Sequence, residues 1–239
     1  MRVGVVGAAT EDTVVLDDGP PQVRPGGTPH YAARALRFAG AEPRTVETAG
    51  MRSLIEHGPG GTRQEILSLP DPLTPERAEH EVLPALEGCD WVLMGGQTAG
   101  DFPPETIAVL AAAGHRICLD GQGLARGSRI GPVMLGPIAQ RDLAGVTALK
   151  LNQAEAETAG RLEVPELLVT RAERGVLVRW LDDWYEIPGN GHRFADPTGA
   201  GDSFGALYCL ERSRNATPPE AALFAVQTVQ RLYARAPAP

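Results

Sequence analysis

Cysteine is scarce in this sequence, with three among 239 residues. Cys89, Cys118 and Cys209 lie far apart, their number is odd, and no C-x-x-C pair is present. These facts argue against a disulfide framework and against a zinc knuckle, because both need paired cysteines. Each cysteine stands in an apolar stretch, so we expect three buried, inert thiols.

Positive charge is also in short supply. The chain has 22 Lys and Arg against 30 Asp and Glu, a formal net charge of −8. A protein that binds the phosphate backbone of nucleic acid needs a basic face, so we expect no nucleic-acid partner. The acidic balance does not exclude a small anionic ligand held by backbone N–H groups.

Long hydrophobic runs are missing as well. No uncharged apolar stretch approaches the ~20 residues that a membrane-spanning helix needs. The apolar start at residues 1–7 soon reaches Glu11 and Asp12 and lacks the core of a secretory signal. We therefore expect a soluble, cytoplasmic protein with no membrane partner.

Several common catalytic motifs are absent. There is no G-x-x-x-x-G-K-[ST], and the first strand is not followed by G-x-G-x-x-G, which argues against a P-loop and a dinucleotide fold. Residues 201–205 do fit the G-x-S-x-G of α/β-hydrolases, but that fold needs its histidine after the serine. All five histidines precede Ser203: His30, His57, His80, His115 and His192. We therefore expect Ser203 to be a helix-start residue and not the nucleophile of a hydrolase.

What the sequence does contain is a regular alternation of β-branched runs with Ala- and Leu-rich stretches. This alternation predicts an α/β fold with a mostly parallel sheet flanked by helices. The expected strands are 3–6, 43–48, 91–94, 116–119, 149–151, 167–170, 176–180 and 184–187. The expected helices are 31–38, 75–87 with Thr74 as N-cap, 104–113, 153–158, 200–211 and 219–234.

Two hairpins, at about 12–25 and 52–69, fall outside this pattern. Turn-rich segments at 17–21 and 57–62 separate their arms. We expect these hairpins to form a small lid beside the main sheet. No linker divides the chain, so we expect one domain over residues 1–239.

The most informative segment is 196–204, Asp-Pro-Thr-Gly-Ala-Gly-Asp-Ser-Phe. Gly199, Ala200 and Gly201 would present free N–H groups at the start of an apolar helix, which is a ready anion site. A carboxylate at the same point, Asp202, suits phosphoryl transfer, where it accepts the proton of an attacking hydroxyl. An ordinary Gly-rich turn with an acidic first helical turn explains the segment equally well on physical grounds.

The segment 196–204 resembles the C-terminal signature of the ribokinase-like sugar kinases, the phosphofructokinase-B family. Further resemblances follow in the family's order: an acidic residue after the first strand, a Gly-Gly pair before a helix, a D-x-Q-G segment, an N-x-x-E motif and a strand–turn on the nucleotide side. In this chain they are Asp12, Gly26-Gly27, 120–123, 152–155 and 170–175. The resemblance implies a three-layer sandwich with a central, mostly parallel sheet and a β-hairpin lid.

The resemblance also implies roles for individual residues. Asp202 would be the general base, and the backbone at Gly199, Ala200 and Gly201 would form the anion hole. The acceptor would be bound by Asp12, Gly26, Gly27 and Tyr31. The nucleotide would be bound by Asn152, Thr170, Arg171, Gly175 and Gly199. Mg²⁺ would be held through water by Glu155 and Asn152, although Asn and Glu at this spacing are also an ordinary helix capping box.

The implied activity is ATP-dependent phosphoryl transfer to a hydroxyl of a sugar or of a cyclitol such as an inositol. A nucleoside kinase of the same family and a catalytically silent, ligand-binding homologue are the alternatives. The implied cofactors are ATP and Mg²⁺, with a monovalent cation as a further candidate. The implied partners are a small polyol or nucleoside and a second copy of the chain, paired through the lids.

Three departures from the family pattern concern the ligands and the lid. Tyr31 stands where the family often has Asn, which leaves the identity of the sugar open. Arg171-Ala172 follows Thr170 where the family has T-x-G. The stretch between strand 43–48 and the second hairpin is short, so we expect a helix and its connections to be missing there.

Overall fold

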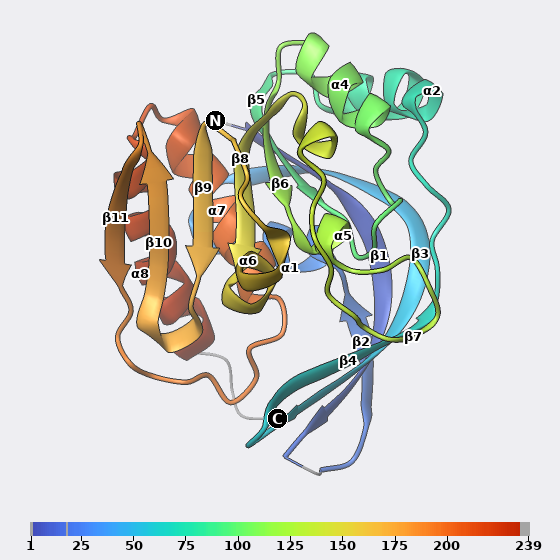
Figure 1. Cartoon of the computed structure of the whole chain (residues 1–239), viewed down its shortest axis with the longest axis vertical. Coiled ribbons are helices and arrows are strands. Elements are labelled where there is room, and N and C mark those ends of the chain that lie inside the picture. Colours follow the sequence, from blue (N-terminus) through green and yellow to red (C-terminus); the bar gives the residue numbers. More distant parts are fainter. Residues whose placement is uncertain (1, 18, 235–239) are drawn as a thin grey trace.

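A sheet of eleven strands runs through the molecule in the computed structural model, which describes residues 2–17 and 19–234 (Figure 1). The strands are β1 (Arg2–Leu16), β2 (Gln22–Gly26), β3 (Glu42–Gly58), β4 (Gly61–Ser68), β5 (Cys89–Gly95), β6 (Arg116–Asp120), β7 (Gly131–Pro132), β8 (Val146–Asn152), β9 (Glu166–Thr170), β10 (Gly175–Trp180) and β11 (Asp183–Pro188). Their order is β11-β10-β9-β8-β6-β5-β1-β3-β4-β7, and β2 pairs with the free side of β1 near its end.

The middle of this sheet is parallel, as the alternation predicted. Strands β3, β1, β5, β6, β8 and β9 pair in parallel, whereas β10 and β11 are antiparallel additions at one edge. Residues 91–94 of β5 are fully buried, which explains why the strand is a continuous apolar run. The carboxyl ends of the parallel strands therefore meet along one edge of the sheet.

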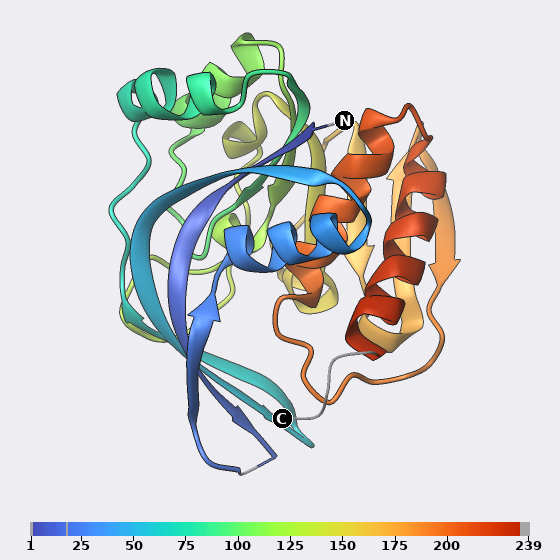
Figure 2. The same cartoon turned by 180° about the vertical axis from the view of Figure 1, so that it is seen from behind.

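Helices cover both faces of the sheet and make a three-layer sandwich. One face carries α1 (Thr28–Phe38), α7 (Ala200–Ser213) and α8 (Pro218–Ala234), which lie in front in Figure 2. The other face carries α2 (Pro75–Arg77), α3 (Leu83–Ala85), α4 (Pro104–Ala112), α5 (Gln122–Ala125) and α6 (Gln153–Ala159) (Figure 1). A separate apolar core fills the space on each face. None of the helices in the described residues is both long and apolar enough to cross a membrane.

The helix expected over 75–87 begins as predicted but is not regular. Thr74 caps it, since its Oγ1 accepts a hydrogen bond from the N–H of Arg77. A π-helical turn at Ala78–Val82 separates α2 from α3, and the N–H of Leu83 donates to the carbonyl of Ala78. Pro84 follows at once and has no N–H to continue an α-helical ladder, which accounts for the widened turn.

The lid contains the two expected hairpins, one formed by β1 and β2 and the other by β3 and β4, but they extend the main sheet and do not stand beside it. Strands β1 and β3 run unbroken from the core into the lid, where they stay parallel from Thr10 paired with Met51 to Leu16 paired with His57. A register shift between Ala8 and Thr10 bends β1 at the junction. We call β2, β4, residues 10–16 of β1 and residues 51–58 of β3 the lid sheet; it lies at the bottom of Figures 1 and 2. No helix interrupts β3, as the short connection predicted.

Candidate active site

A cleft of about 620 Å³ lies between the lid sheet, the carboxyl ends of the parallel strands and the start of α7. The predicted site residues that line it are Asp12, Gly27, Tyr31, Asn152, Glu155, Thr170, Arg171, Gly175, Gly199, Ala200, Gly201 and Asp202. Only Gly26 of the predicted set does not line the cleft. The fold thus brings together residues that are up to 190 positions apart in the chain, from Asp12 to Asp202.

The anion loop, residues 199–201, owes its shape to Gly199. This glycine is left-handed, with φ 76° and ψ 4°, and it is the residue from which α7 begins. The N–H of Ala200 donates to the carbonyl of Pro197 at 3.0 Å, so it is not free as the sequence suggested. The donors that this loop can offer a ligand are therefore the N–H groups of Gly199 and Gly201.

Two glycines with the same φ of 76°, Gly199 and Gly191, give a matched test of this loop. A Cβ at Gly199 would overlap the ring of Tyr31, whereas a Cβ at Gly191 would meet nothing within 4 Å. We expect Gly191→Ala to lose about 1 kcal/mol of unfolding free energy through backbone strain. Gly199→Ala should lose a further ~1–3 kcal/mol through the collision. Urea unfolding measures both, and equal losses would show that Tyr31 does not constrain the loop.

Asp202 lies in the first turn of α7 and faces the cleft. Its Oδ1 accepts a hydrogen bond of 2.5 Å from the hydroxyl of Thr28, the first residue of α1. Burial raises the pKa of Asp202 to about 6, and the nearby Asp120 carboxylate adds to the rise. Lys150 and the Thr28 hydrogen bond act in the opposite direction. The carboxylate is thus a base whose proton affinity suits neutral pH.

This pKa sets an expected pH dependence. A general base works only when it is deprotonated, so kcat/KM should fall as the pH drops through about 6 and level off above it. The profile of kcat/KM against pH between 4.5 and 9 measures this limb. A profile that stays flat down to pH 4.5 would mean that Asp202 keeps a pKa near the ordinary aspartate value of 3.8 and is not buried as the structure has it.

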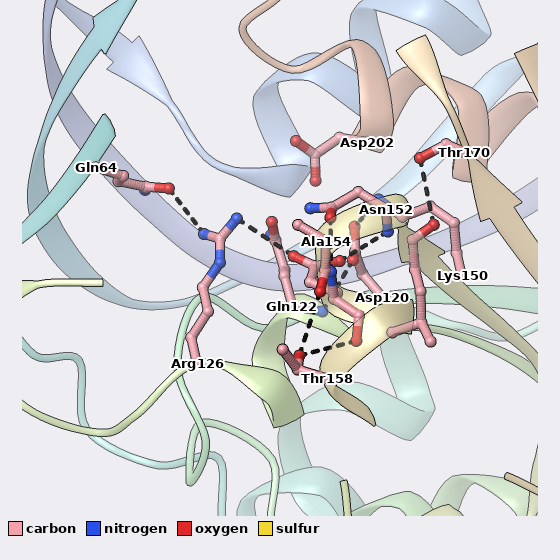
Figure 3. A network of polar contacts seen from close by, with 12 residues as sticks. Gln64, Asp120, Gln122, Arg126, Lys150, Asn152, Ala154, Thr158, Thr170 and Asp202 are labelled. Carbon is pink, nitrogen blue, oxygen red and sulfur yellow. Dashed lines mark hydrogen bonds and ion pairs between the residues drawn. The ribbon is translucent and has the colours of Figure 1, made fainter. Parts of the chain in front are cut away.

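A buried ion pair next to Asp202 was not assigned a role from the sequence. Lys150, in β8, places its Nζ 2.5 Å from Oδ2 of Asp120 at the end of β6 (Figure 3). Burial opposes the charge of Lys150, but the surrounding carboxylates of Asp120, Asp202 and Glu155 outweigh it and raise its pKa. A Cβ at Gly201 would stand 2.8 Å from this Nζ, so the ammonium group lies against the anion loop. The feature of the sequence that could have pointed to this ion pair is the single lysine in the mostly apolar strand 146–152.

Asn152 and Glu155 form the capping box of α6, which uses one carboxylate oxygen of Glu155 and not the other. Asn152 Oδ1 accepts from the N–H of Glu155 at 2.9 Å, and Glu155 Oε2 accepts from the N–H of Asn152 at 2.8 Å. Glu155 Oε1 is buried and has no hydrogen-bond partner among the described residues; Arg126 Nη2 lies 3.7 Å away. Burial and the Asp120 carboxylate raise the pKa of Glu155.

This spare oxygen is the feature that could hold a metal ion. Mg²⁺ is commonly bound through one or two carboxylates, several waters and the phosphates of a substrate. Glu155 Oε1 in the cleft fits that arrangement, as the sequence suggested. The described residues contain no cluster of three or more His, Cys, Asp or Glu side chains that would form a complete protein cage.

Asp12 stands at the lid end of the cleft. Its Oδ1 accepts a 2.7 Å hydrogen bond from the hydroxyl of Ser53, and only 4% of the residue is exposed. Gly26 lies beside it, and a Cβ there would overlap the Asp12 carboxyl group. Gly26 therefore does not line the cleft, but its lack of a side chain leaves the space that the Asp12 carboxyl group occupies. Gly27 has φ 86° and precedes α1, and a Cβ there would strike the carbonyl of Ala8.

Tyr31 and Arg126 complete the lid end. The Tyr31 hydroxyl is buried with no hydrogen-bond partner among the described residues, and burial raises its pKa to about 12. Arg126, which follows α5, donates from Nη1 to Gln64 Oε1 of β4 at 2.9 Å (Figure 3). Since Arg126 also faces Glu155, it joins the lid to the spare carboxylate oxygen.

The other end of the cleft holds the predicted nucleotide residues. Thr170 donates its hydroxyl to the carbonyl of Leu151 at 3.3 Å, and Arg171 pairs with Glu186 at 2.6 Å. Gly175 has φ 98° and a Cβ there would overlap the carbonyl of Ile187, so its role is to shape the turn. Beyond it the lining includes Asn190, His192, Arg193 and Phe194, together with Val226, Val229 and Gln230 from α8.

The interpretations given to Ser203 and the cysteines are supported. Ser203 is fully buried, and its hydroxyl contacts the Tyr31 carbonyl and the Tyr233 hydroxyl at 3.4 and 3.3 Å. It is therefore not an exposed nucleophile. Cys89, Cys118 and Cys209 are free and buried.

Comparison with known proteins places the fold. No protein-family model and no curated protein matches the sequence. Among solved structures, a pyrophosphate-dependent kinase in the ribokinase family, complexed with a pyrophosphate analog and myo-inositol, is similar with a TM-score of 0.79 and 19% identity over 99% of this chain and 96% of that one. A Burkholderia thailandensis nucleoside kinase in complex with inosine gives 0.75 and 17% over 95% and 89%.

A third structure, ribokinase from Thermotoga maritima, is similar with a TM-score of 0.66 and 18% identity over 99% of this chain and 94% of that one. Each of these three similarities extends over at least 95% of this chain and at least 89% of the other. At these identities the likeness concerns the fold. It confirms the ribokinase-like three-layer α/β fold expected from the sequence.

Proposed function

We propose that this protein is a kinase that transfers a phosphoryl group from ATP to a hydroxyl of a small polyol, a sugar or a cyclitol. The observation that carries the proposal is the convergence of Asp202, Lys150 and the anion loop at the centre of one cleft, with Asp12 at its lid end. A base of raised pKa beside a cation and helix N-terminal N–H groups is the equipment that phosphoryl transfer needs. The likeness to solved ribokinase-fold kinases agrees with it.

The chemistry assigns a part to each group. The acceptor hydroxyl loses its proton to Asp202 while its oxygen forms a bond to the terminal phosphorus of the donor. The bond between that phosphorus and the bridging oxygen breaks, and its electron pair leaves with the rest of the donor. The N–H groups of Gly199 and Gly201, with the Lys150 ammonium group, stabilise the charge on the transferring group.

Glu155, helped by Asn152, would hold Mg²⁺ through water at its spare oxygen. When bound, Mg²⁺ neutralises charge on the donor phosphates. Thr170 and Arg171 border the donor, and Gly175 shapes the turn beneath it. The monovalent cation, the cytoplasmic location and the pairing of two lids stay predictions.

A polyol is favoured over a nucleoside as acceptor by the lining of the lid end. Apart from Ile55, the side chains of the lid sheet that line it carry hydrogen-bonding groups: Thr10, Asp12, His57, Thr62 and Gln64. The ring of Tyr31 packs against Gly199, so that side of the ring is not open for stacking a base. The nucleoside alternative keeps the support of the inosine-bound structure.

Pyrophosphate is the second candidate for the donor. Three similar solved structures are described as pyrophosphate-dependent, with TM-scores of 0.79, 0.77 and 0.80, and the third concerns the conversion of a myo-inositol-1 kinase into a myo-inositol-3 kinase. The donor end of the cleft also carries exposed cationic groups at Arg174 and Arg193 that suit a compact, highly charged donor. Either donor would transfer its terminal phosphoryl group through the same centre.

The test is a matrix of donors and acceptors. The purified full-length protein is incubated with Mg²⁺, with ATP or pyrophosphate, and with a sugar panel, myo-inositol or inosine. Phosphorylated acceptor is detected by ³¹P NMR or mass spectrometry, which separates transfer from donor hydrolysis. We expect one polyol to be phosphorylated, and Asp202→Asn to phosphorylate it at least about 100-fold more slowly. No phosphorylated acceptor with either donor would favour the catalytically silent homologue.

A further inference from the structure

Direct polar contacts tie the lid sheet to the segment that leads into the anion loop. Arg24 of β2 places Nη2 2.5 Å from Oδ2 of Asp196. His57 of β3 places Nε2 2.8 Å from the hydroxyl of Thr198. Arg193 donates to the carbonyl of Gly58 at 3.1 Å. Both hairpins of the lid thus contact residues 193–198, which are more than 130 positions away in sequence.

Asp196 uses its two oxygens for different purposes. Oδ1 accepts hydrogen bonds from the N–H of Thr198 at 3.0 Å and from its hydroxyl at 2.6 Å, which closes the turn directly before Gly199. Oδ2 receives Arg24. Burial opposes ionisation of Asp196, but the hydrogen bonds from Thr198 and Arg24 outweigh it and lower its pKa. The same carboxylate therefore shapes the catalytic loop and joins it to the lid.

The His57 contact extends this chain of hydrogen bonds. Because the Thr198 hydroxyl donates to Asp196, it accepts from Nε2–H of His57, and Nδ1 of His57 then accepts from the Thr62 hydroxyl at 2.9 Å. Burial lowers the pKa of His57, which agrees with a neutral ring in this arrangement. The turn at 196–198 is thus held from the lid at two points.

Arg24 has a second neighbour that matters. In the antiparallel ladder of β1 and β2, Arg24 is the direct partner of Asp12, the carboxylate proposed to bind the acceptor. Directly opposed residues of a ladder project to the same face of the sheet. One short stretch of the lid therefore carries the acceptor group and the contact to the catalytic loop.

We propose that Arg24 is a positioning residue that couples the lid to catalysis: its contact with Asp196 holds the 196–198 turn, and through it the anion loop, when the lid lies over an acceptor at Asp12. This inference rests on the proposed kinase activity. The contact between Arg24 and Asp196 would hold the anion loop in its catalytic geometry mainly when the lid is closed. Transfer of the donor phosphoryl group to water would therefore be limited while the lid is open.

The test compares Arg24→Gln with Arg24→Lys, Asp196→Asn and the double variant Arg24→Gln/Asp196→Asn. Arg63→Gln is the matched control, since it removes an exposed lid arginine of β4. We expect Arg24→Gln to lower kcat by about 10- to 100-fold, because small displacements of a catalytic group have effects of this size. KM for the acceptor should change less than about threefold if Arg24 acts on the loop and not on binding. Arg24→Lys should recover part of kcat, and the double variant should be no worse than its poorer parent.

A second measurement separates this inference from the kinase proposal. Amide hydrogen exchange of residues 193–203 needs no substrate, and we expect faster exchange there in Arg24→Gln than in the wild type or Arg63→Gln. Unchanged exchange and unchanged kcat would overturn the coupling. If the wild type phosphorylates no acceptor but exchange is faster in Arg24→Gln, the kinase proposal is contradicted, whereas the contact between the lid and the loop is supported. Additive losses in the double variant would show that Arg24 and Asp196 act separately and would also overturn it.

Discussion

Asp202→Asn is expected to lower kcat by about 10²- to 10⁴-fold, the usual contribution of a general base. The asparagine keeps the shape of the side chain, and its carbonyl oxygen can still accept the hydrogen bond from Thr28. The amide cannot take the proton of an acceptor hydroxyl. The loss should therefore fall on phosphoryl transfer and leave donor binding, measured by calorimetry, close to that of the wild type.

The same variant should be no less stable than the wild type above pH 6. The folded pKa of Asp202 is raised by burial, so its ionised form is disfavoured in the folded protein compared with the unfolded chain. The stability that this raised pKa supplies at low pH is lost as the pH rises through about 6. A neutral asparagine does not have that cost, so unfolding by urea at pH 8 should need at least as much denaturant.

Asp90→Asn is the control for this experiment, because Asp90 is an exposed aspartate of β5 outside the cleft. It should change neither turnover nor stability beyond error. Turnover near the wild-type value in Asp202→Asn would mean that the hydroxyl is deprotonated by another group. A large loss of stability at pH 8 would instead mean that the carboxylate is structural.

The core strands could be predicted closely because they are buried on both faces. The run 91–94 lies inside β5, which begins two residues earlier and ends one later, and the run 116–119 starts with β6, which ends one residue later. A strand covered by helices on both sides is apolar at every position, and that pattern is local. The loop at 199–201 was also visible, because its glycines and Asp202 are neighbours in the sequence.

The lid strands could not be traced in the same way. Beyond the bend between Ala8 and Thr10, β1 carries Glu11 and Asp12, so its outer half does not continue the apolar run of its inner half. A change in pattern at a bulge is easily taken for the end of a strand. The pairing of β1 with β3 through the lid joins residues about 40 positions apart, which no local signal records.

The polar partners of the site were missed for a similar reason. Thr28 lies 174 positions from Asp202, and Asp120 lies 30 positions from Lys150. Each is an ordinary residue in its own segment and gains its importance only from its partner. Glu155 shows the opposite case, since its capping box was predicted from local spacing and the structure contains it. Local spacing could not tell whether Glu155 also binds a metal ion, and that role is supported by its Oε1, which has no hydrogen-bond partner in the part of the chain that the structure describes.

Lys150→Met is expected to lower the free energy of unfolding by about 3–5 kcal/mol, the cost of breaking a buried ion pair by removing one partner. Asp120 would keep a carboxylate that is 1% exposed, with Gln122 N–H at 3.2 Å as its remaining hydrogen bond. Arg77→Met is the matched contrast, because it breaks a surface pair with Glu81 at 2.9 Å. Such a pair within one helix contributes only about 0.3–0.5 kcal/mol.

The double variant Asp120→Asn/Lys150→Met decides whether the loss comes from the stranded charge. Replacing both partners of a buried pair is often neutral, so most of the stability should return. Activity should not return with it, because Lys150 lies against the anion loop at Gly201 and also holds down the pKa of Asp202. The acid limb of kcat/KM should accordingly move to higher pH in Lys150→Met. Full recovery of kcat in the double variant would limit Lys150 to a structural role, whereas stability restored without turnover assigns its charge to the transfer step.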